Sequence, residues 1–499
     1  MSKPKPIFYS ALMLTGVNLL LRFVGTSFQV FLSSRIGPAG IGLLQLVMSV
    51  GMLATVAGIG GIRTATMYLT AEEIGKRKPQ NTTWVLSACI LYSIAFSGAV
   101  SILLYTFAPQ IAENWIGDGS TENALRLYAS FLPVVCLTAV MTGYFTGANR
   151  IGTLAAVEVA EQLVSMALTM ALLILWAGQN PIRSCLAVIL GSSLGGCLTL
   201  GCLVFLRLRE KPRKTAQIPV RNRLLHTALP LALADDLKSG ITTVENLMVP
   251  KRLALNVKTA NPLASFGLVS GMVFPVIMFP AAILFGLTEL LVPELARCNA
   301  SESRDRIHYL LHRSLRVALI YGLIIGGLIF ILSDALCSRL FGSMDAAPHL
   351  RSYALLIPML YCDTVTDALT KGLGQQKICV RYNILTSFLD VVFLWFLLPR
   401  FGMTGYFLSF FVTHLINFCL SLRRLLVITG QPISPSVPIR CALGAAFGLY
   451  SASFAPGKVL PSVCYGAILM SLLFLLGVFR LEDILWLISL GQKKTSPER

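Results

Sequence analysis

The amino-acid sequence predicts an all-α integral membrane protein with fourteen transmembrane helices. Hydrophobic residues make up 55% of the 499 residues and charged residues only 13%, whereas about 25% of residues are charged in a typical soluble domain. Apolar stretches recur along the whole chain, and each is long enough to cross a hydrocarbon core of roughly 30 Å. Such stretches must form helices, because backbone groups inside lipid have no water to bond.

Many connections between the predicted spans are only a few residues long, so no soluble domain fits between them. The basic N-terminal segment leads into an apolar run without a small-residue cleavage site. We therefore expect this run to be retained as the first helix. The predicted spans cover residues 8–34, 41–68, 84–107, 124–147, 152–177, 183–206, 224–250, 262–288, 309–333, 352–372, 380–399, 403–422, 437–455 and 461–479.

Positive charge lies mainly in the short connections. The net charge is +18, and basic clusters occur at residues 76–78, 207–223 and 297–316. With the N-terminus inside, most of these residues fall on the cytoplasmic side, which predicts that both termini are cytoplasmic. This distribution is a membrane orientation signal, so we expect no nucleic-acid partner.

The sequence carries no signature of catalysis or of a bound cofactor. Its 12 cysteines are scattered without a Cys-x-x-Cys pair, so neither a metal site nor a disulfide framework is predicted. No phosphate-binding Gly-x-x-x-x-Gly-Lys motif occurs. His414, in the middle of a span, is interpreted as a packing residue. We expect no cofactor, no metal and no enzymatic activity.

Two halves of the chain resemble each other. The segment 127–133 (LYASFLP) is followed fourteen residues after its proline by Gly147, and the segment 352–358 (SYALLIP) is followed at the same distance by Gly372, an offset of 225. A second match, at an offset of 216, pairs two cations thirteen residues apart in each half: Arg22 with Arg35, and Lys238 with Lys251. Six spans separate the equivalents, so the repeats share one orientation.

The repeat predicts a domain organisation. Spans one to six form an N-terminal lobe over residues 1–215, and spans seven to twelve form a C-terminal lobe over residues 216–430. Spans thirteen and fourteen (residues 431–480) are accessory helices, and residues 481–499 form a cytoplasmic tail. Duplicated six-helix lobes are a transporter architecture, so a transporter is predicted.

Ionisable residues inside spans are candidates for a substrate site, because each costs at least about 2.5–3.5 kcal/mol at a helix centre. The first and seventh spans each place three polar residues on one helical face. Arg63 follows a glycine-rich stretch that allows bending or close packing. We predict a cavity whose cations attract a phosphate, lined by Arg22, Arg63, Lys238, Asn18, Gln29 and Glu245. In the alternative, Lys238 pairs with Asp235 or Glu245, Arg22 bonds nearby carbonyls, and Arg63 lies at the interface.

Acidic residues in the spans are candidates for ion coupling. Asp363, Asp367 and Lys371 follow one another at four-residue steps, an order that favours neutralising pairs along a helix. A site for a coupling cation or proton is the alternative. Asp390 is open to both interpretations. The candidate ion-coupling residues are Asp235, Asp363, Asp367, Glu158 and Glu161.

Several motifs resemble a known family. They are the turn at 35–42 after the first span, the glycine-rich segment 57–61, the segment 143–147 that closes the fourth span, and Glu161-Gln162 in the fifth. Together with fourteen spans, they make nearly the whole chain similar to the stage V sporulation protein B and polysaccharide-exporter branch of the multidrug/oligosaccharidyl-lipid/polysaccharide flippase superfamily.

The resemblance implies two pseudo-symmetric six-helix lobes in a V around a central cavity that faces each side of the membrane alternately. It implies a flippase for an undecaprenyl-pyrophosphate-linked sugar, such as lipid II or a polysaccharide precursor. The resemblance also implies that the flippase lies in the bacterial cytoplasmic membrane and serves cell-wall, spore-cortex or polysaccharide synthesis. The implied partners are the lipid-linked oligosaccharide, membrane lipids and a cell-wall or polysaccharide synthase.

In related lipid II flippases a cationic cavity receives the pyrophosphate, and two additional C-terminal helices help to form a groove for the lipid tail. Arg22, Arg63 and Lys238 are the counterparts of those cations here, by span and depth. The acidic residues beside Lys238, which are Asp235, Asp236 and Glu245, depart from an all-cationic cavity.

Two other functions are weighed against the flippase. A cation-coupled multidrug exporter of the same superfamily suits the acidic residues, although the arginines disfavour a cationic cargo. A membrane-embedded glycosyltransferase or polymerase would need a large extracytoplasmic loop with catalytic residues, and the sequence has no such loop.

Overall fold

The computed structural model describes residues 7–76, 81–178, 180–209, 221–257, 259–430, 436–454 and 460–477. These residues are almost entirely helical. Eight helices are long and apolar enough to cross a membrane, or nine when one bent pair counts as a single span. The predicted all-α membrane fold is confirmed, while the count of fourteen spans stays a prediction.

Most helices agree with the predicted spans to within a few residues. In the first half they are α3 (Thr82–Gln110), α4 (Glu122–Gly147), α5 (Ile151–Leu172), α6 (Pro181–Leu208) and α7 (Arg221–Leu253). In the second half they are α13 (Ile357–Gly372), α14 (Gln376–Phe401), α16 (Ser436–Ala452) and α17 (Leu460–Leu475). α11 (Arg304–Phe341) and α15 (Met403–Thr429) extend up to eight residues beyond their predicted spans, and the short α12 (Ala347–Ala354) lies mostly before the predicted span 352–372.

Glycines decide where the first helices bend. α1 (Ile7–Ile59) consists of two helices that meet at a kink at Gly37, with φ 78° and ψ 170°, inside the turn predicted after residue 34. The predicted second span is interrupted at Gly60 and Gly61, which have φ of 49° and 68°. α2 (Ile62–Gly75) then follows. Glycine adopts positive φ without steric cost, so the bend that the sequence allowed at these glycines is present.

The predicted span 262–288 is a broken helix. It starts as α8 (Pro262–Gly267), the π-helical η5 (Leu268–Val273) and α9 (Phe274–Met278). A bend of 58° precedes α10 (Ala281–Ala300). Pro280 lies at this bend, where its missing N–H and its ring favour a helix break. α10 continues to residue 300, twelve residues beyond the predicted end of this span at residue 288.

The chain divides into two compact units. Unit 1 contains Met1–Val17 and Arg35–Gly267, and unit 2 contains Asn18–Ser34 and Leu268–Arg499. Each unit therefore includes most of the first helix of the other predicted lobe: residues 18–34 belong to unit 2, and α7 belongs to unit 1. The predicted lobe boundary at residue 215 concerns the sequence repeat and stays a prediction.

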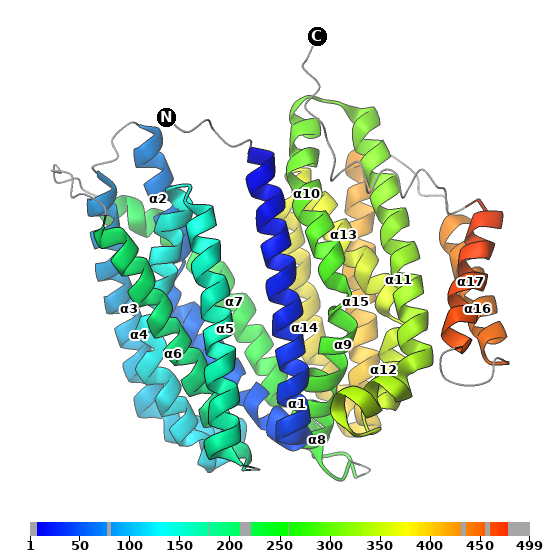
Figure 1. Cartoon of the computed structure of the whole chain (residues 1–499), viewed down its shortest axis with the longest axis horizontal. Helices are drawn as coiled ribbons and strands as arrows, with labels where there is room; N and C mark the ends of the chain where they lie inside the picture. The colour runs from blue at the N-terminus through cyan, green and yellow to red at the C-terminus, as the bar shows by residue number, and fades with distance from the viewer. Residues whose placement is uncertain are drawn as a thin grey trace. The chain divides into compact units, whose positions relative to one another are not determined.

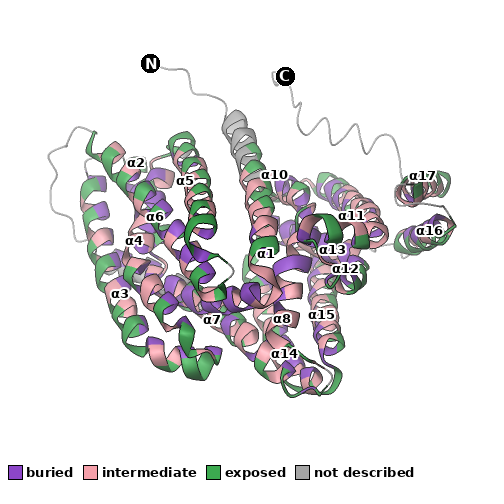
Figure 2. Ribbon diagram, turned by 60° about the horizontal axis from the view of Figure 1, so that its bottom comes forward, coloured by how far each residue is buried: buried purple, intermediate pink, exposed green. Residues whose placement is uncertain are grey.

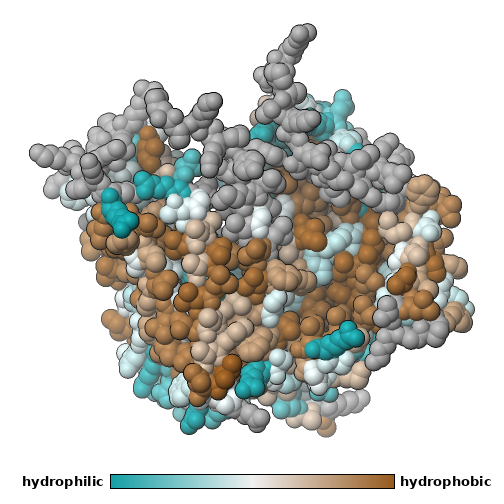
Figure 3. Space-filling model, viewed as in Figure 1, coloured by the Kyte–Doolittle hydropathy of each residue, from teal (hydrophilic) through white to brown (hydrophobic). Residues whose placement is uncertain are grey.

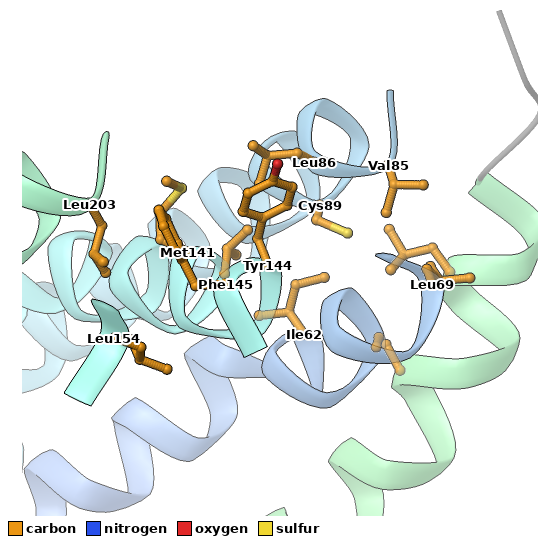
Figure 4. Close-up of a cluster of buried hydrophobic side chains, with 14 residues drawn as sticks. Ile62, Leu69, Val85, Leu86, Cys89, Met141, Tyr144, Phe145, Leu154 and Leu203 are labelled. Atoms are coloured by element: carbon orange, nitrogen blue, oxygen red, sulfur yellow. The ribbon is translucent and has the colours of Figure 1, made fainter. Parts of the chain in front are cut away.

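The core of unit 1 lies among α2, α3, α4, α6 and α7. Figure 4 shows its central side chains, including Ile62, Cys89 and Phe145, clustered between the helices. α4 can approach α2 because glycines lie at the crossing. A methyl group on Gly143 would lie 2.3 Å from the carbonyl oxygen of Arg63. Side chains larger than hydrogen would therefore force the helices apart.

In unit 2, α13 packs against α10, α11 and α15, and α14 packs against α15. α16 and α17 lie side by side (Figure 1) and pack against α11. The Tyr465 hydroxyl of α17 donates to the Leu323 carbonyl at 2.8 Å. Gly327 leaves room for the Tyr465 ring, because a methyl group there would lie 2.0 Å from it.

The packing extends the internal repeat. A methyl group on Gly147 would lie 2.5 Å from the carbonyl oxygen of Met67, and one on Gly372 would lie 3.1 Å from that of Val292. Met67 and Val292 differ by 225, the offset of the two glycines themselves. The contact of α4 with α2 and that of α13 with α10 are thus equivalent, which supports the duplication.

The outer sides of the helices are apolar. Large hydrophobic side chains such as Leu91 on α3 and Leu175 beyond α5 are 71% and 85% exposed. Figure 2 shows exposed residues along the outer side of α3, and Figure 3 shows hydrophobic residues over most of the visible surface, with hydrophilic residues gathered toward two edges. An apolar exterior of this kind suits a lipid environment.

Candidate functional site

Arg22 lies on α1 in unit 2 and is exposed. Its guanidinium carbon lies 4.1 Å from the centroid of the Phe285 ring of α10. A ring face binds the guanidinium plane and leaves its N–H groups available at the edge. Within the part of the chain that the structure describes, no ion pair engages this guanidinium. Arg22 is therefore a cation in an apolar helix that is able to bind an anion.

Arg63 lies in unit 1 on the first turn of α2 and is exposed. Its guanidinium attracts the carboxylate of Glu158 on α5, while Glu161, one turn further along α5, repels that carboxylate. From the sequence, Arg63, Glu158 and Glu161 were separate candidates. In the fold they interact electrostatically with one another. Arg63 is thus partly compensated by acidic neighbours.

α7 places its polar residues in unit 1. Lys238 and Asp235 are exposed, and Glu245 is partly buried. Among the described residues Lys238 forms no ion pair, so the alternative in which it pairs with Asp235 or Glu245 gains no support. Asn18 and Gln29 lie on α1. The side chain of Asn18 lies outside the described part, and that of Gln29 is partly buried.

Asp363 and Asp367 of α13 meet polar side chains of the neighbouring helices in unit 2. The amide nitrogen of Asn417 on α15 donates to both oxygens of Asp363, at 3.2 Å each. Ser421 of α15 donates to Asp367 at 3.1 Å, and Lys371 Nζ lies 3.7 Å from the same carboxylate. The predicted pairing along the helix is therefore present between Asp367 and Lys371, while α15 supplies the donors for Asp363.

Asp390 of α14 is buried against the same helix. Its Oδ1 accepts hydrogen bonds from Ser409 at 2.5 Å and from Thr413 at 3.3 Å. Both donors lie on α15, one and two turns before Asn417. A carboxyl group buried inside a membrane helix bundle is expensive, so Asp390 joins the candidate site residues.

The sequence reasoning missed the donors on α15. They are Ser409, Thr413, Asn417 and Ser421, here called the α15 stripe, and all four are buried. Their four-residue spacing places them on one helical face and could have been read from the sequence. What the sequence did not show is that each faces a carboxylate of another helix.

Metal-ligand chemistry is not visible in the described ranges. No group of three or more His, Cys, Asp or Glu side chains there is placed to hold a metal ion. The described cysteines are all free. The ring of His414 packs against that of Phe410 with centroids 4.1 Å apart, which agrees with the packing role predicted for it.

Two family models match adjacent segments of the chain. One, described as "Polysaccharide biosynthesis protein", matches residues 7–249, and the other, described as "MatE", matches residues 247–396. Stage V sporulation protein B of Bacillus subtilis (strain 168) is 23% identical over 413 residues, which cover 79% of this chain and 78% of that protein.

Two solved structures share the fold. The lipid II flippase MurJ in an inward closed conformation has a TM-score of 0.68 at 14% identity, covering 95% of this chain and 99% of that chain. An inward-facing multidrug resistance MATE family transporter of the MOP superfamily has a TM-score of 0.66 at 14% identity, covering 84% and 100%.

The helical fold, its apolar exterior and its charges inside apolar helices define a multi-pass membrane transporter. The resemblance seen in the sequence is confirmed by the two family models and the sporulation protein. The chain belongs to the multidrug/oligosaccharidyl-lipid/polysaccharide flippase superfamily, and within it to the flippase branch.

Proposed function

We propose that this protein flips an undecaprenyl-pyrophosphate-linked sugar across the bacterial cytoplasmic membrane, with both termini in the cytoplasm. The observation that carries the proposal is Arg22. Its guanidinium lies against Phe285 at 4.1 Å, and no described carboxylate neutralises it. A pyrophosphate is the kind of anion that such a cation binds with bidentate, charge-assisted hydrogen bonds.

The relatives support a lipid-linked cargo. One family model is described as a polysaccharide biosynthesis protein, one relative is a sporulation protein, and one structural neighbour is a lipid II flippase. A sugar-phosphate headgroup cannot cross hydrocarbon unaided, whereas a polyprenyl tail is soluble there. A protein with fixed positive charge inside the membrane lowers the barrier for the headgroup by electrostatics alone, and alternating access completes the transfer.

The remaining predicted cavity residues fit this role unequally. Lys238 is an exposed cation without an ion pair among the described residues, and we propose it as a second phosphate-binding candidate. Arg63 is partly compensated by Glu158, so its contribution is expected to be smaller. Asn18, Gln29 and Glu245 are proposed to contact the sugars, for which neutral and acidic hydrogen-bonding groups are suitable partners.

Translocation of lipid II in proteoliposomes tests the proposal. Arg22→Ala and Lys238→Ala are each expected to slow flipping by about tenfold to a hundredfold, the loss of one charge-assisted hydrogen bond. Arg351→Ala is the matched control, because Arg351 also lies over a ring, that of Phe330, but is paired with Asp334. Equal rates for Arg22→Ala, Arg351→Ala and wild type would rule out a pyrophosphate site at Arg22.

The carboxylates of α13 support coupling to a cation. Asp363 and Asp367 lie one turn apart, and α15 supplies their neutral donors. We propose that they take the coupling ion, as the acidic residues of the predicted set would. Glu158, Glu161 and Asp235 are weaker candidates, since Glu158 already attracts Arg63.

The second candidate function is a cation-coupled multidrug exporter. The observation that favours it is the pair Asp363 and Asp367, together with the fold shared with a multidrug resistance transporter. Dye efflux that depends on a sodium or proton gradient, in proteoliposomes that flip no lipid II, would select this function. In that case Asp363→Asn abolishes efflux and Arg22→Ala leaves it unchanged.

A further inference from the structure

The break in the eighth predicted span is held by two tyrosines of unit 2. The Tyr361 hydroxyl of α13 donates to the carbonyl oxygen of Ile277 in α9 at 3.0 Å. The Tyr321 hydroxyl of α11 donates at 2.8 Å to the carbonyl oxygen of Pro280, the N-cap of α10. The two tyrosine rings stack with centroids 5.7 Å apart. One tyrosine pair therefore binds a carbonyl on each side of the break and restrains its angle.

These hydrogen bonds satisfy backbone groups at a place where a helix cannot do so. Pro280 has no N–H group and cannot continue the hydrogen-bonded ladder of a helix. A carbonyl that loses its helical partner inside a membrane has no water to replace it. Ile277 and Tyr361 are each 1% exposed, so the hydroxyl takes the place of water at this carbonyl. Removing a hydroxyl while keeping its ring would weaken the restraint on the bend and leave the packing in place.

The first helix contacts the broken span on both sides of the bend. The ring of Phe23 packs against that of Phe279, the residue before Pro280, with centroids 5.3 Å apart. The neighbouring Arg22 lies over the ring of Phe285, five residues after Pro280. Adjacent residues of α1 thus touch opposite sides of the break. The bend angle therefore decides where the Phe285 ring lies relative to the Arg22 guanidinium.

A third contact fixes α1 along the length of the broken span. The Ser33 hydroxyl donates to the Gly271 carbonyl oxygen of η5 at 2.6 Å, and both residues are buried. Ser33 follows Arg22 by eleven residues, which is about three helical turns. Because this end of α1 is anchored to η5, the helix cannot slide to follow a change in the bend. A changed bend therefore alters the contact between Arg22 and Phe285.

A related arrangement occurs in unit 1. The second predicted span is broken at Gly60 and Gly61, and the Tyr92 hydroxyl of α3 donates to the Gly60 carbonyl oxygen at 3.3 Å. Arg63 follows on the first turn of α2. Tyr92 belongs to the third predicted span and Tyr321 to the ninth, which are equivalent in the repeat. The recurrence of a tyrosine-bound break near a candidate cation in both halves favours a role in binding over packing alone.

We propose that Tyr321 and Tyr361 are positioning residues for anion binding in unit 2. Their hydroxyls hold the bend at Pro280, the bend holds Phe285, and the Phe285 ring orients the Arg22 guanidinium for a phosphate or pyrophosphate group. Orientation matters because bidentate hydrogen bonds require the guanidinium plane to match the anion. The inference rests on the proposed function, which assigns the anion to Arg22.

Titration calorimetry of the full-length protein in nanodiscs, with inorganic pyrophosphate as the ligand, tests the inference without a transport assay. Tyr321→Phe and Tyr361→Phe are each expected to weaken binding by about threefold to tenfold, the net effect of one hydrogen bond. Wild-type affinity in either variant overturns the role of that tyrosine. Thermal unfolding of each variant confirms that it is folded.

Tyr465→Phe is the matched control for a purely structural effect. It also removes a hydrogen bond of 2.8 Å from a tyrosine hydroxyl to a backbone carbonyl in unit 2. Its thermal stability is expected to fall as in the other two variants, while its affinity for pyrophosphate stays at the wild-type value. An equal loss of affinity in Tyr465→Phe overturns the proposal, because general loosening of unit 2 would then explain all three variants.

A double-mutant cycle tests the route through Phe285. Phe285→Leu removes the ring beneath Arg22 and is expected to weaken pyrophosphate binding by about threefold to tenfold. Adding Tyr321→Phe is expected to cause a further loss of less than about twofold, since the hydroxyl no longer has a ring to position. Additive losses overturn the route.

The outcomes separate this inference from the proposed function. Binding that is weakened by Arg22→Ala but not by the tyrosine variants overturns the inference and leaves the anion site in place. Binding that depends on Arg22 and on both tyrosines, in a protein that flips no lipid II, supports the inference and overturns the lipid-linked cargo. No pyrophosphate binding by the wild type overturns the anion site and the inference together.

Discussion

The duplicated glycines make a quantitative prediction about helix packing. In Gly147→Ala, the new methyl carbon would lie 2.5 Å from the carbonyl oxygen of Met67 and 2.9 Å from Cβ of Thr70. A carbon and a carbonyl oxygen rest at about 3.3–3.6 Å, so α4 and α2 must separate by roughly 1 Å. The backbone cannot yield as a flexible side chain does, and overpacking of this kind costs about 1–3 kcal/mol.

Gly372→Ala is the milder change. Its methyl carbon would lie 3.1 Å from the carbonyl oxygen of Val292 and 2.9 Å from Cβ of Leu295, so a smaller movement relieves the contact. We expect a cost at the lower end of the same range, about 1 kcal/mol. Gly201→Ala in the interior of α6 is the control, because no atom lies within 4 Å of its added methyl group. There the better helix propensity of alanine stabilises by up to about 1 kcal/mol.

Thermal unfolding of the purified protein in detergent measures all three variants. The expected order of stability is Gly201→Ala at or above wild type, then Gly372→Ala, then Gly147→Ala. Wild-type stability of Gly147→Ala would refute the reasoning, because it would mean that α4 does not touch α2 at this glycine. A larger loss in Gly372→Ala than in Gly147→Ala would contradict the ranking by distance.

Three more predictions concern unit 2. A double-mutant cycle of Asp363→Asn and Asn417→Leu is expected to give a coupling energy of about 0.6–1.7 kcal/mol, the range for hydrogen bonds between membrane helices; additive losses would contradict the bond. Tyr465→Phe removes the hydrogen bond to Leu323 and should lower the stability measured by thermal unfolding by about 0.5–1.5 kcal/mol. Limited proteolysis is the check on this prediction: if the linkers that flank α17 stay uncut in the variant, α17 remains docked without the bond. Burial lowers the pKa of the His349 ring, which precedes the tenth predicted span. The folded state then binds fewer protons than the unfolded one as the pH falls below about 6.5, so thermal stability decreases there, and His349→Gln should flatten that decrease.

Much of the fold follows from the sequence because the physics is local. A run of apolar residues in lipid has to be helical, and most of the predicted spans agree with helices in the structure. Gly60 and Gly61 indicated in the sequence that the chain could bend before α2. The break in the span at 262–288 was not predicted, since a π-helical turn followed by a bend at Pro280 depends on how neighbouring helices receive the freed backbone groups. The Tyr321 hydroxyl, for example, donates a hydrogen bond to the Pro280 carbonyl oxygen at 2.8 Å.

The candidate site was predicted less completely. Charges in apolar spans could be found one at a time, because their cost is intrinsic to the residue. Their partners come from other helices and have no signal in a single sequence. Glu158 meets Arg63 through the packing of α5, and Asp363 meets Asn417 across 54 residues. The sequence also offered Asp390 without any reason to prefer a site over a buried structural residue.

The sequence by itself determined that this is a duplicated helical membrane protein, since hydrophobic length, charge placement and the repeat of 225 residues are all properties of the chain read in order. Only the tertiary structure decided which side chains share a site. The two compact units each include most of the first helix of the other predicted lobe, so neighbours in space are not neighbours in the repeat. The reason is that hydrophobic burial acts within a helix face, whereas a hydrogen bond to a buried carboxylate requires a second helix at a distance of about 3 Å.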